Sequence, residues 1–370
     1  MSDAQEPTAP LRVALSHDYL LVMRGAERTF AAIADLYTRA PILTLLYDEQ
    51  GTNGHFANRE ITTSPLQRLG VGQDKFRRLL PLYPWAVGRL KLPPCDVLIS
   101  SSSAFAHGIA VPEDTLHMCY CHAPFRYAWN EQALAIAEVA RPLRPIVGRQ
   151  LLRIRRWDLS ASRGVDMYIA NSRLCQEQIK RYYDRDSTII HPPVETTRFA
   201  PGEPGDALLV VSEIVRHKRL QVALEAARRA RAPIQIVGSG PDRDALSKAY
   251  PEAQFLGRVS DEELARLYAG ARAVMIPGVE EFGITAVEAQ AAGRPVIAAG
   301  GGGALETVLD GQTGVFALLD DVESFAEAIK RVDRLDFDPA RAIGNADRFS
   351  VAAFRRRLAA QVSHAVENQR

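Results

Sequence analysis

The stretch Met275–Ala299, MIPGVEEFGITAVEAQAAGRPVIAA, carries two carboxylates whose spacing suits binding of a polar ligand. Glu280 lies in a loop after an apolar strand pattern that ends at Ile276. Glu288 lies about one and a half turns into the helix pattern that begins near Gly283. Carboxylates accept hydrogen bonds from sugar and ribose hydroxyls. The alternative is that both acids face solvent on an alanine-rich helix.

The backbone amides at the start of the same helix can bind an anion. Phe282, Gly283 and Ile284 occupy that position, where N–H groups have no partner within the helix and the helix dipole favours negative charge. A diphosphate suits such a place. The stretch therefore predicts a phosphate subsite flanked by two hydroxyl-binding acids.

Alternating strand and helix patterns must position these residues. The strand patterns are Arg12–Ser16, Ile42–Tyr47, Asp96–Ser100, Leu116–Cys121, Met167–Ala170, Ser187–Ile190, Ala207–Ser212, Pro233–Val237, Ala273–Ile276 and Pro295–Ala298. Helix patterns include Ala26–Leu36, Gln221–Ala230, Asp261–Ala269 and Ile284–Ala292. This alternation predicts an α/β protein with parallel sheets. The proline-rich segment His191–Gly205 divides the strands into two sets, so we expect two doubly wound, Rossmann-like domains facing across a cleft that holds the ligand.

Composition excludes several classes of protein. A chain of 370 residues with 47% hydrophobic and 24% charged residues is typical of a globular protein with two domains. Its four cysteines form no CxxC pair, so we expect neither a zinc ribbon nor a disulfide scaffold. The polar start MSDAQEPTAP and the lack of a long apolar run predict a cytoplasmic protein without a signal peptide or membrane span.

Basic residues are concentrated in two stretches of the first half. Arg68–Lys91 holds six basic residues, and Arg141–Arg163 holds seven arginines. In the second stretch, Val147, Leu151 and Ile154 share one helical face, with Arg149, Arg153 and Arg156 roughly opposite. Such a helix can lie on an anionic membrane surface, or it can be a solvated face of a soluble domain.

Several motifs, in order along most of the chain, resemble glycosyltransferase family 4, which has the GT-B fold. They are SHDYLLVMRGAERTF, APILTLLYD, CHAPFRYAWN, YIANS, IIHPPVETTRF, VVSEIVRHKRL, VGSGPDRDAL, FLGRVSDEEL, the Glu-x7-Glu segment and GGALETV. The resemblance is closest to bacterial mannosyltransferases that build O-antigens and exopolysaccharides. It implies an acceptor-binding domain at residues 1–195, a donor-binding domain at 196–348 and a last helix, 349–370, that packs back on the first domain.

The resemblance also implies a role for each matching residue. Glu280 would hold the transferred sugar and Glu288 the ribose, while Phe282, Gly283 and Ile284 offer amides to sugar and phosphates. The remaining expected donor or catalytic residues are Lys218 and Arg216 at the diphosphate, His122 at the sugar, Gly25 in the turn after the first strand, and Arg258 and Val259 at the nucleobase. His122, Lys218 and Glu280 would carry the catalysis.

The implied activity is a retaining transfer of a hexose to a glycan or polyprenyl-linked glycan, and the expected donor is GDP-mannose. A front-face displacement would need positioning and charge stabilisation rather than a protein nucleophile. Positive groups and helix amides would replace a divalent metal, so we expect no metal site and no cofactor, the nucleotide sugar being a substrate. The protein would act at the inner face of the cytoplasmic membrane.

Three positions depart from the family pattern. Glu213 stands where an arginine usually faces the diphosphate, and Arg24 and Val22 replace glycines in a loop that shapes the acceptor pocket. We expect Glu213 either to turn away or to pair with Arg216 or Lys218. These departures leave open a catalytically weak or silent protein that binds sugar nucleotides as a scaffold.

Two further classes compete with a transferase. Gly238-Ser239-Gly240 follows a strand as in a dinucleotide-dependent oxidoreductase, but Arg243 occupies the third glycine position of that fingerprint. Nucleic-acid binding is disfavoured because the basic stretches lack interleaved aromatic residues.

Overall fold

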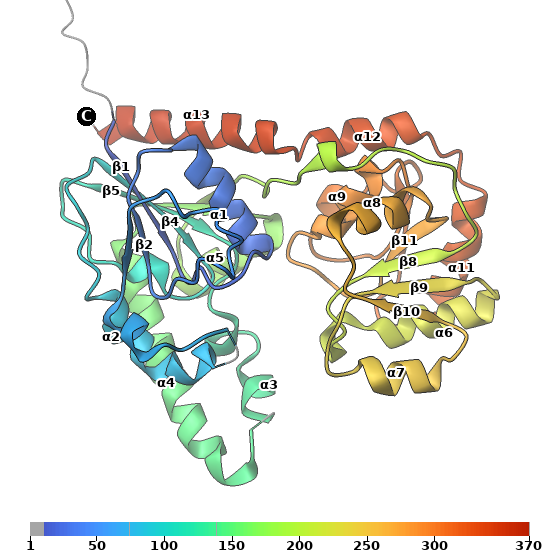
Figure 1. Ribbon diagram of the computed structural model, residues 1–370, viewed down its shortest axis with the longest axis horizontal. Coiled ribbons are helices and arrows are strands. Elements are labelled where there is room, and N and C mark those ends of the chain that lie inside the picture. Colours follow the sequence, from blue (N-terminus) through green and yellow to red (C-terminus); the bar gives the residue numbers. More distant parts are fainter. Residues whose placement is uncertain (1–10, 74, 138, 370) are drawn as a thin grey trace, which may run out of the picture. The chain divides into compact units, whose positions relative to one another are not determined.

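The computed structural model describes residues 11–369, except 74 and 138. The chain forms two compact units, each with its own parallel sheet (Figure 1). Unit 1 contains Met1–Asn171, Cys175–Ile190 and Arg355–Arg370, and unit 2 contains Ser172–Leu174 and His191–Phe354. The division lies at Ile190, whereas the sequence placed it at Glu195. The expected acceptor and donor roles of the two parts stay predictions, and the polar N-terminal segment lies outside the described residues.

Unit 1 is built on a seven-stranded parallel sheet with the order β3-β2-β1-β4-β5-β6-β7. The strands are β1 (Val13–His17), β2 (Ile42–Thr44), β3 (Ile61–Thr63), β4 (Val97–Ser102), β5 (Leu116–Cys121), β6 (Met167–Ala170) and β7 (Ser187–Ile189). Every residue of β1, β4 and β5 is buried, which is typical of a sheet covered on both faces. The order reverses between β1 and β4, where such folds form a crevice for ligands.

Helices and short 3₁₀ turns join these strands. The helices are α1 (Gly25–Leu36), α2 (Tyr83–Val87), α3 (Gln132–Ala137), α4 (Arg144–Ala161), α5 (Arg173–Tyr183) and most of α13 (Val351–Gln369). The 3₁₀ turns are Pro65–Leu69, Phe76–Leu82, Ala106–Gly108, Arg126–Ala128, Arg141–Leu143 and Ser162–Gly164.

Unit 2 contains a six-stranded parallel sheet with the order β10-β9-β8-β11-β12-β13. The strands are β8 (Leu208–Val211), β9 (Ile234–Val237), β10 (Gln254–Gly257), β11 (Ala273–Ile276), β12 (Val296–Ala299) and β13 (Gly314–Ala317). The helices are α6 (Leu220–Ala230), α7 (Arg243–Ala249), α8 (Asp261–Ala269), α9 (Ile284–Ala291), α10 (Ala304–Thr307), α11 (Val322–Asp333) and α12 (Pro339–Asp347), with 3₁₀ turns at Thr196–Arg198 and Arg216–Lys218.

Alternate residues of the unit 2 strands enter separate cores on the two faces of the sheet. Leu208 packs with α6 and α11, whereas its neighbour Leu209 packs with α8 and α9. This arrangement needs strands that are apolar on both faces, as their sequences are. The expected fold class, two doubly wound parallel sheets, is therefore confirmed.

The strands that sequence patterns did not identify all lie at sheet edges. They are β3 in unit 1 and β10 and β13 in unit 2. Edge strands have a neighbour on one side only, and the residues of β3 and β10 are half-buried or exposed. β3 and β10 therefore lack the continuous apolar run that identifies a central strand, whereas β13 is mostly buried and this reason does not apply to it.

The C-terminal helix α13 begins in unit 2 and continues into unit 1 at Arg355. The Arg355 guanidinium donates hydrogen bonds to the Ala32 carbonyl and to Asp35, at 3.3 and 2.9 Å, on α1. Further along, the Gln361 side chain lies 3.2 Å from the Met167 sulfur. These contacts attach the end of the chain to the first sheet.

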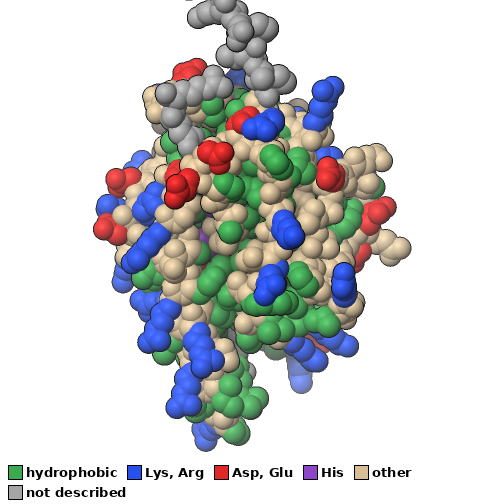
Figure 2. Space-filling model, turned by 90° about the vertical axis from the view of Figure 1, so that its left-hand side faces the viewer, with side chains coloured by type: hydrophobic (Ala, Val, Ile, Leu, Met, Phe, Trp, Pro, Cys, Tyr) green, Lys and Arg blue, Asp and Glu red, His purple; other side chains and the backbone are tan. Residues whose placement is uncertain are grey.

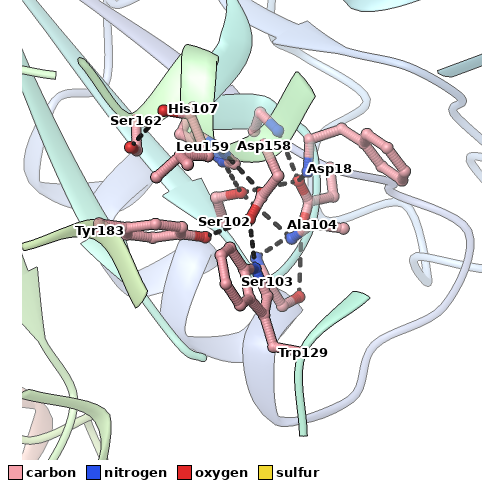
Figure 3. A network of polar contacts seen from close by, with 12 residues as sticks. Asp18, Ser102, Ser103, Ala104, His107, Trp129, Asp158, Leu159, Ser162 and Tyr183 are labelled. Atoms are coloured by element: carbon pink, nitrogen blue, oxygen red, sulfur yellow. Dashed lines mark hydrogen bonds and ion pairs between the residues drawn. The ribbon is translucent and has the colours of Figure 1, made fainter. Parts of the chain in front are cut away.

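A buried polar network holds α4 against the ends of β1 and β4 (Figure 3). The Asp18 carboxylate accepts hydrogen bonds from the Ser103, Phe105 and Ala106 amides at 2.7–2.8 Å. Burial favours the neutral acid, but the neighbouring His17 and these amides outweigh it and lower the Asp18 pKa.

The network continues from Ser102 through His107 to Asp158, a buried residue of α4. Asp158 lies 3.3 Å from His107 and accepts hydrogen bonds from Trp129 and Tyr183 at 2.6 and 2.9 Å (Figure 3). Burial favours neutral His107, yet the hydrogen bond and charge of Asp158 raise the His107 pKa. The inner face of α4 is therefore fixed, and Arg149, Arg153 and Arg156 are exposed on the rest of the helix.

Candidate functional site

Lys218 and Glu280 form an ion pair at the carboxyl edge of the unit 2 sheet. The Lys218 ammonium donates to both Glu280 carboxylate oxygens, at 2.7 and 2.6 Å. Both side chains are half-buried, with 21% and 24% exposed. Lys218 follows β8 and Glu280 follows β11, which are neighbours in the sheet. The order of strands reverses between them, so the pair lies where parallel α/β sheets form ligand crevices.

Glycines allow neighbouring loops to pack tightly on the Lys218 loop. A Cβ at Gly240 would lie 2.2 Å from the Ile214 carbonyl oxygen, and one at Gly278 would lie 3.1 Å from that of Lys218. The Gly238-Ser239-Gly240 sequence that suggests a dinucleotide fingerprint therefore has a packing role here, in support of the loop that carries Lys218.

The loop after β11 leads into α9 through a left-handed residue. Gly283 has φ +81°, a conformation that favours glycine, and it caps the helix that begins at Ile284. No hydrogen-bond acceptor lies against the amides of Phe282, Gly283 or Ile284 among the residues that the structure describes. The expected group of three amides is thus available at this helix terminus.

A second glycine contact fixes the Glu280 loop from the side of β12. The Gly303 amide donates to the Glu280 carbonyl at 2.9 Å, and a Cβ at Gly303 would lie 2.2–2.3 Å from Phe282 backbone atoms. The Phe282 ring is buried against His191 and Phe349, with centroids 5.5 Å away in both cases. The loop is therefore held by backbone and by core packing.

Glu288 lies on α9 and is held by a buried tyrosine. The Tyr268 hydroxyl, from the end of α8, donates to a Glu288 carboxylate oxygen at 2.7 Å. Burial, followed by the adjacent Glu288 charge, raises the Tyr268 pKa well above its ordinary value. Tyr268 therefore remains a protonated donor to the carboxylate. Sequence patterns give no sign of this contact, because Tyr268 reads as an ordinary core residue of an amphipathic helix.

The other predicted unit 2 residues are less closely held. Arg258 follows β10 and donates to the Ser239 hydroxyl at 3.0 Å, while Val259 packs on the core beneath α8 and α9. Arg216 is exposed. Glu213 is exposed too. In the described part of the chain it forms no ion pair with Arg216 or Lys218, so of the two expected arrangements the structure has the one in which Glu213 turns away.

Of the residues predicted in unit 1, His122 follows β5 and belongs to a hydrogen-bonded group of three side chains. Its Nε2 lies 2.9 Å from the Ser101 hydroxyl, which also lies 3.1 Å from Nδ1 of His17. Burial, together with His17, lowers the His122 pKa to about 3. A neutral imidazole at pH 7 can hydrogen bond a sugar hydroxyl without adding charge. Ser101 belongs to no sequence motif that would have predicted its contact with His122.

Gly25, the other predicted unit 1 residue, is the first residue of α1. Its carbonyl accepts a hydrogen bond from the Thr29 hydroxyl at 3.0 Å. Arg24 caps this helix with φ −109°, and its amide donates to Glu27 at 3.1 Å. A side chain at residue 24 is therefore compatible with this turn, although the family pattern has glycine there.

Comparisons with known proteins show which sequences and folds this chain is similar to. Residues 205–333 match the family model described as glycosyl transferases group 1. The D-inositol 3-phosphate glycosyltransferase of Nocardioides sp. (strain ATCC BAA-499 / JS614) is 31% identical over 246 residues, 55% of this chain and 52% of that protein. The enzyme of the same name from Mycolicibacterium smegmatis is 30% identical over 203 residues, 47% of this chain and 46% of that protein. The chain spans about half the length of these curated relatives.

Solved structures share the fold over nearly the whole chain. Anabaena Alr3699/HepE in complex with UDP has a TM-score of 0.71 and 17% identity, covering 96% of this chain and 100% of that one. Sucrose-phosphate synthase from Thermosynechococcus elongatus has a TM-score of 0.72 and 18% identity, covering 97% and 100%. The chain thus has the GT-B fold, and its residues 205–333 match the group 1 glycosyltransferase family model. The resemblance to family 4 is confirmed at this level.

Proposed function

We propose that the chain is a glycosyltransferase that uses a nucleotide sugar as donor. The observation that carries the proposal is the ion pair of Lys218 with Glu280 at the reversal of strand order in unit 2, with Glu280 in the loop that leads into α9. An ammonium group and free helix amides can bind a diphosphate, and a carboxylate can accept hydrogen bonds from sugar hydroxyls. The group 1 match over the same segment supports this assignment.

Each residue would act mainly by positioning and by offsetting charge. Lys218 and the amides of Gly283 and Ile284 would stabilise the charge that develops on the departing nucleoside diphosphate. Glu280 would hold the sugar hydroxyls, and neutral His122 would donate to or accept from the same sugar. Lys218 and the terminus of α9 would supply the positive charge that the departing diphosphate needs. We therefore propose transfer without a divalent metal or cofactor.

The finer identity of donor and acceptor rests on the sequence motifs. We propose retention of configuration and transfer of mannose from GDP-mannose to a glycan or polyprenyl-linked glycan. The similar HepE structures bind UDP and UDP-glucose, so a uridine donor is the alternative that has to be tested alongside.

A thermal-shift panel of GDP-mannose, UDP-glucose and NAD, followed by a transfer assay, tests this function. Selective binding to the folded state raises the melting temperature with the logarithm of ligand excess. We expect a rise with GDP-mannose, none with NAD, and transfer to a glycan acceptor. Binding without transfer would favour the silent scaffold, and a shift with NAD alone would contradict the proposal.

We also propose that α4 contacts an anionic membrane surface. Arg149, Arg153 and Arg156 are exposed, and the exposed Ile146 and Leu152 lie among them. Figure 2 shows basic and apolar side chains together on this face of the molecule, toward its lower end. No helix in the described part of the chain is long and apolar enough to cross a bilayer. Contact from the surface needs only such an amphipathic helix.

Replacing Arg149, Arg153 and Arg156 together by glutamate should abolish sedimentation with vesicles rich in phosphatidylserine. Each basic residue near such a surface contributes about 1 kcal/mol, so losing three lowers affinity by at least about 100-fold. The matched control reverses Arg341, Arg356 and Arg357, exposed arginines of α12 and α13. Binding of the native chain that does not depend on anionic lipid would contradict the electrostatic part of the proposal.

A further inference from the structure

The buried Tyr268 is hydrogen bonded to the half-buried Glu288, and no sequence motif predicts this contact. Tyr268 is fully buried in the core between α8, α9 and the sheet, and its ring meets Phe199 edge-on with centroids 5.2 Å apart. Its hydroxyl donates to the half-buried Glu288 carboxylate at 2.7 Å. A rigid core residue therefore holds one oxygen of a side chain that would otherwise have several rotamers.

The protonation state of the phenol fixes the direction of the hydrogen bond between Tyr268 and Glu288. The phenol, which burial and Glu288 keep protonated, has one hydrogen to give, and the carboxylate receives it. Tyr268 thus holds one Glu288 carboxylate oxygen from the side of the core.

We propose that Tyr268 is a positioning residue that orients Glu288 toward the vicinal hydroxyls of the nucleotide's ribose. This inference rests on the proposed function of Glu288. A carboxylate has about four acceptor positions, so it can receive Tyr268 and still accept from two ribose hydroxyls. Without the Tyr268 bond, the Glu288 side chain has to be ordered by the ligand, and that ordering costs affinity.

Titration calorimetry on the full chain separates positioning from a structural role. The probes are GDP, UDP and their 2′,3′-dideoxy forms, which lack the hydroxyls that Glu288 would bind. We expect the native chain to prefer one ribonucleotide over its dideoxy form. Tyr268→Phe keeps the ring and should weaken ribonucleotide binding about tenfold, the scale of one hydrogen bond to a charged group. It should leave dideoxynucleotide binding within about twofold.

Two variants complete the test. Tyr250→Phe removes a hydroxyl from another buried tyrosine of unit 2 and should leave the preference unchanged. Glu288→Asp shortens the side chain by one methylene, out of reach of Tyr268, without removing a buried hydroxyl, so it too should lose the preference. It also serves if Tyr268→Phe does not fold.

The outcomes distinguish failure of the inference from failure of the proposed function. If the native chain binds neither GDP nor UDP, the proposed function is wrong and the inference falls with it. If it prefers a ribonucleotide and Tyr268→Phe or Glu288→Asp keeps the full preference, the positioning role alone is overturned. Equal weakening of both ligand forms in Tyr268→Phe would mark a purely structural role and would also overturn it.

Discussion

Replacing Lys218 by alanine should lower sugar transfer by at least about 100-fold, the scale for loss of one preorganised electrostatic contact in an active site. Lys218 is a half-buried cation paired with Glu280 in the loop before α9, and it would stabilise charge on the departing nucleoside diphosphate. Glu280→Ala should have an effect of similar size, because the sugar would lose its carboxylate and Lys218 its partner at 2.6 Å. Initial rates with saturating acceptor measure both.

The two residues are in contact, so their effects should not multiply. We expect the double variant Lys218→Ala/Glu280→Ala to be little slower than the worse single variant. Lys330→Ala is the matched control, since Lys330 also pairs with a glutamate, Glu327, at 3.2 Å but on the exposed surface of α11. Near-native transfer by both single variants would show that the pair is not part of the site.

Replacing Gly303 by alanine should disable the site without touching a ligand-binding side chain. The added Cβ would lie 2.2–2.3 Å from Phe282 backbone atoms, which no side-chain rotation can relieve. The loop carrying Glu280 must therefore shift. We expect a loss of about 1–3 kcal/mol in stability from overpacking, and a loss of about 100-fold in transfer, because a displacement of about 1 Å has that effect.

Gly344→Ala is the matched control for this substitution. Gly344 is exposed within α12, and a Cβ there meets no atom within 4 Å. Alanine in a helix interior is favoured over glycine by about 1 kcal/mol, so this variant should be as stable as the native chain or more so, with unchanged transfer. Chemical denaturation and the transfer assay together give the comparison. Native behaviour of Gly303→Ala would mean that the loop tolerates a different backbone path.

The central strands could be predicted from the sequence because burial on both faces demands continuous apolar runs. β1 (Val13–His17) and β11 (Ala273–Ile276) are buried throughout, and the sequence predicts them at Arg12–Ser16 and Ala273–Ile276. Gln254–Gly257 was missed because it is an edge strand of alternating half-buried and exposed residues, with a register irregularity after Phe255. Its pairing depends on β9 rather than on its own sequence, and only the folded sheet reveals that dependence.

The parts of the candidate site that come from one continuous segment of the chain could be predicted from the sequence. Gly283 caps α9, which begins at Ile284, close to the expected start, because the residues that set this turn lie next to one another in the chain. The contact of Lys218 with Glu280, 62 residues apart, depends on β8 and β11 being neighbours, which no local period encodes. The contacts of Tyr268 with Glu288 and of Ser101 with His122 could not be predicted either, because in each pair the two residues belong to different elements.

A structure of the chain with its nucleotide sugar bound tests the central claim most directly. We expect the diphosphate to lie within hydrogen-bond distance of the Ile284 amide and the Lys218 ammonium, with Glu280 on the sugar and Glu288 on the ribose. A diphosphate bound elsewhere, or Glu280 and Glu288 facing bulk water in the complex, would contradict the claim.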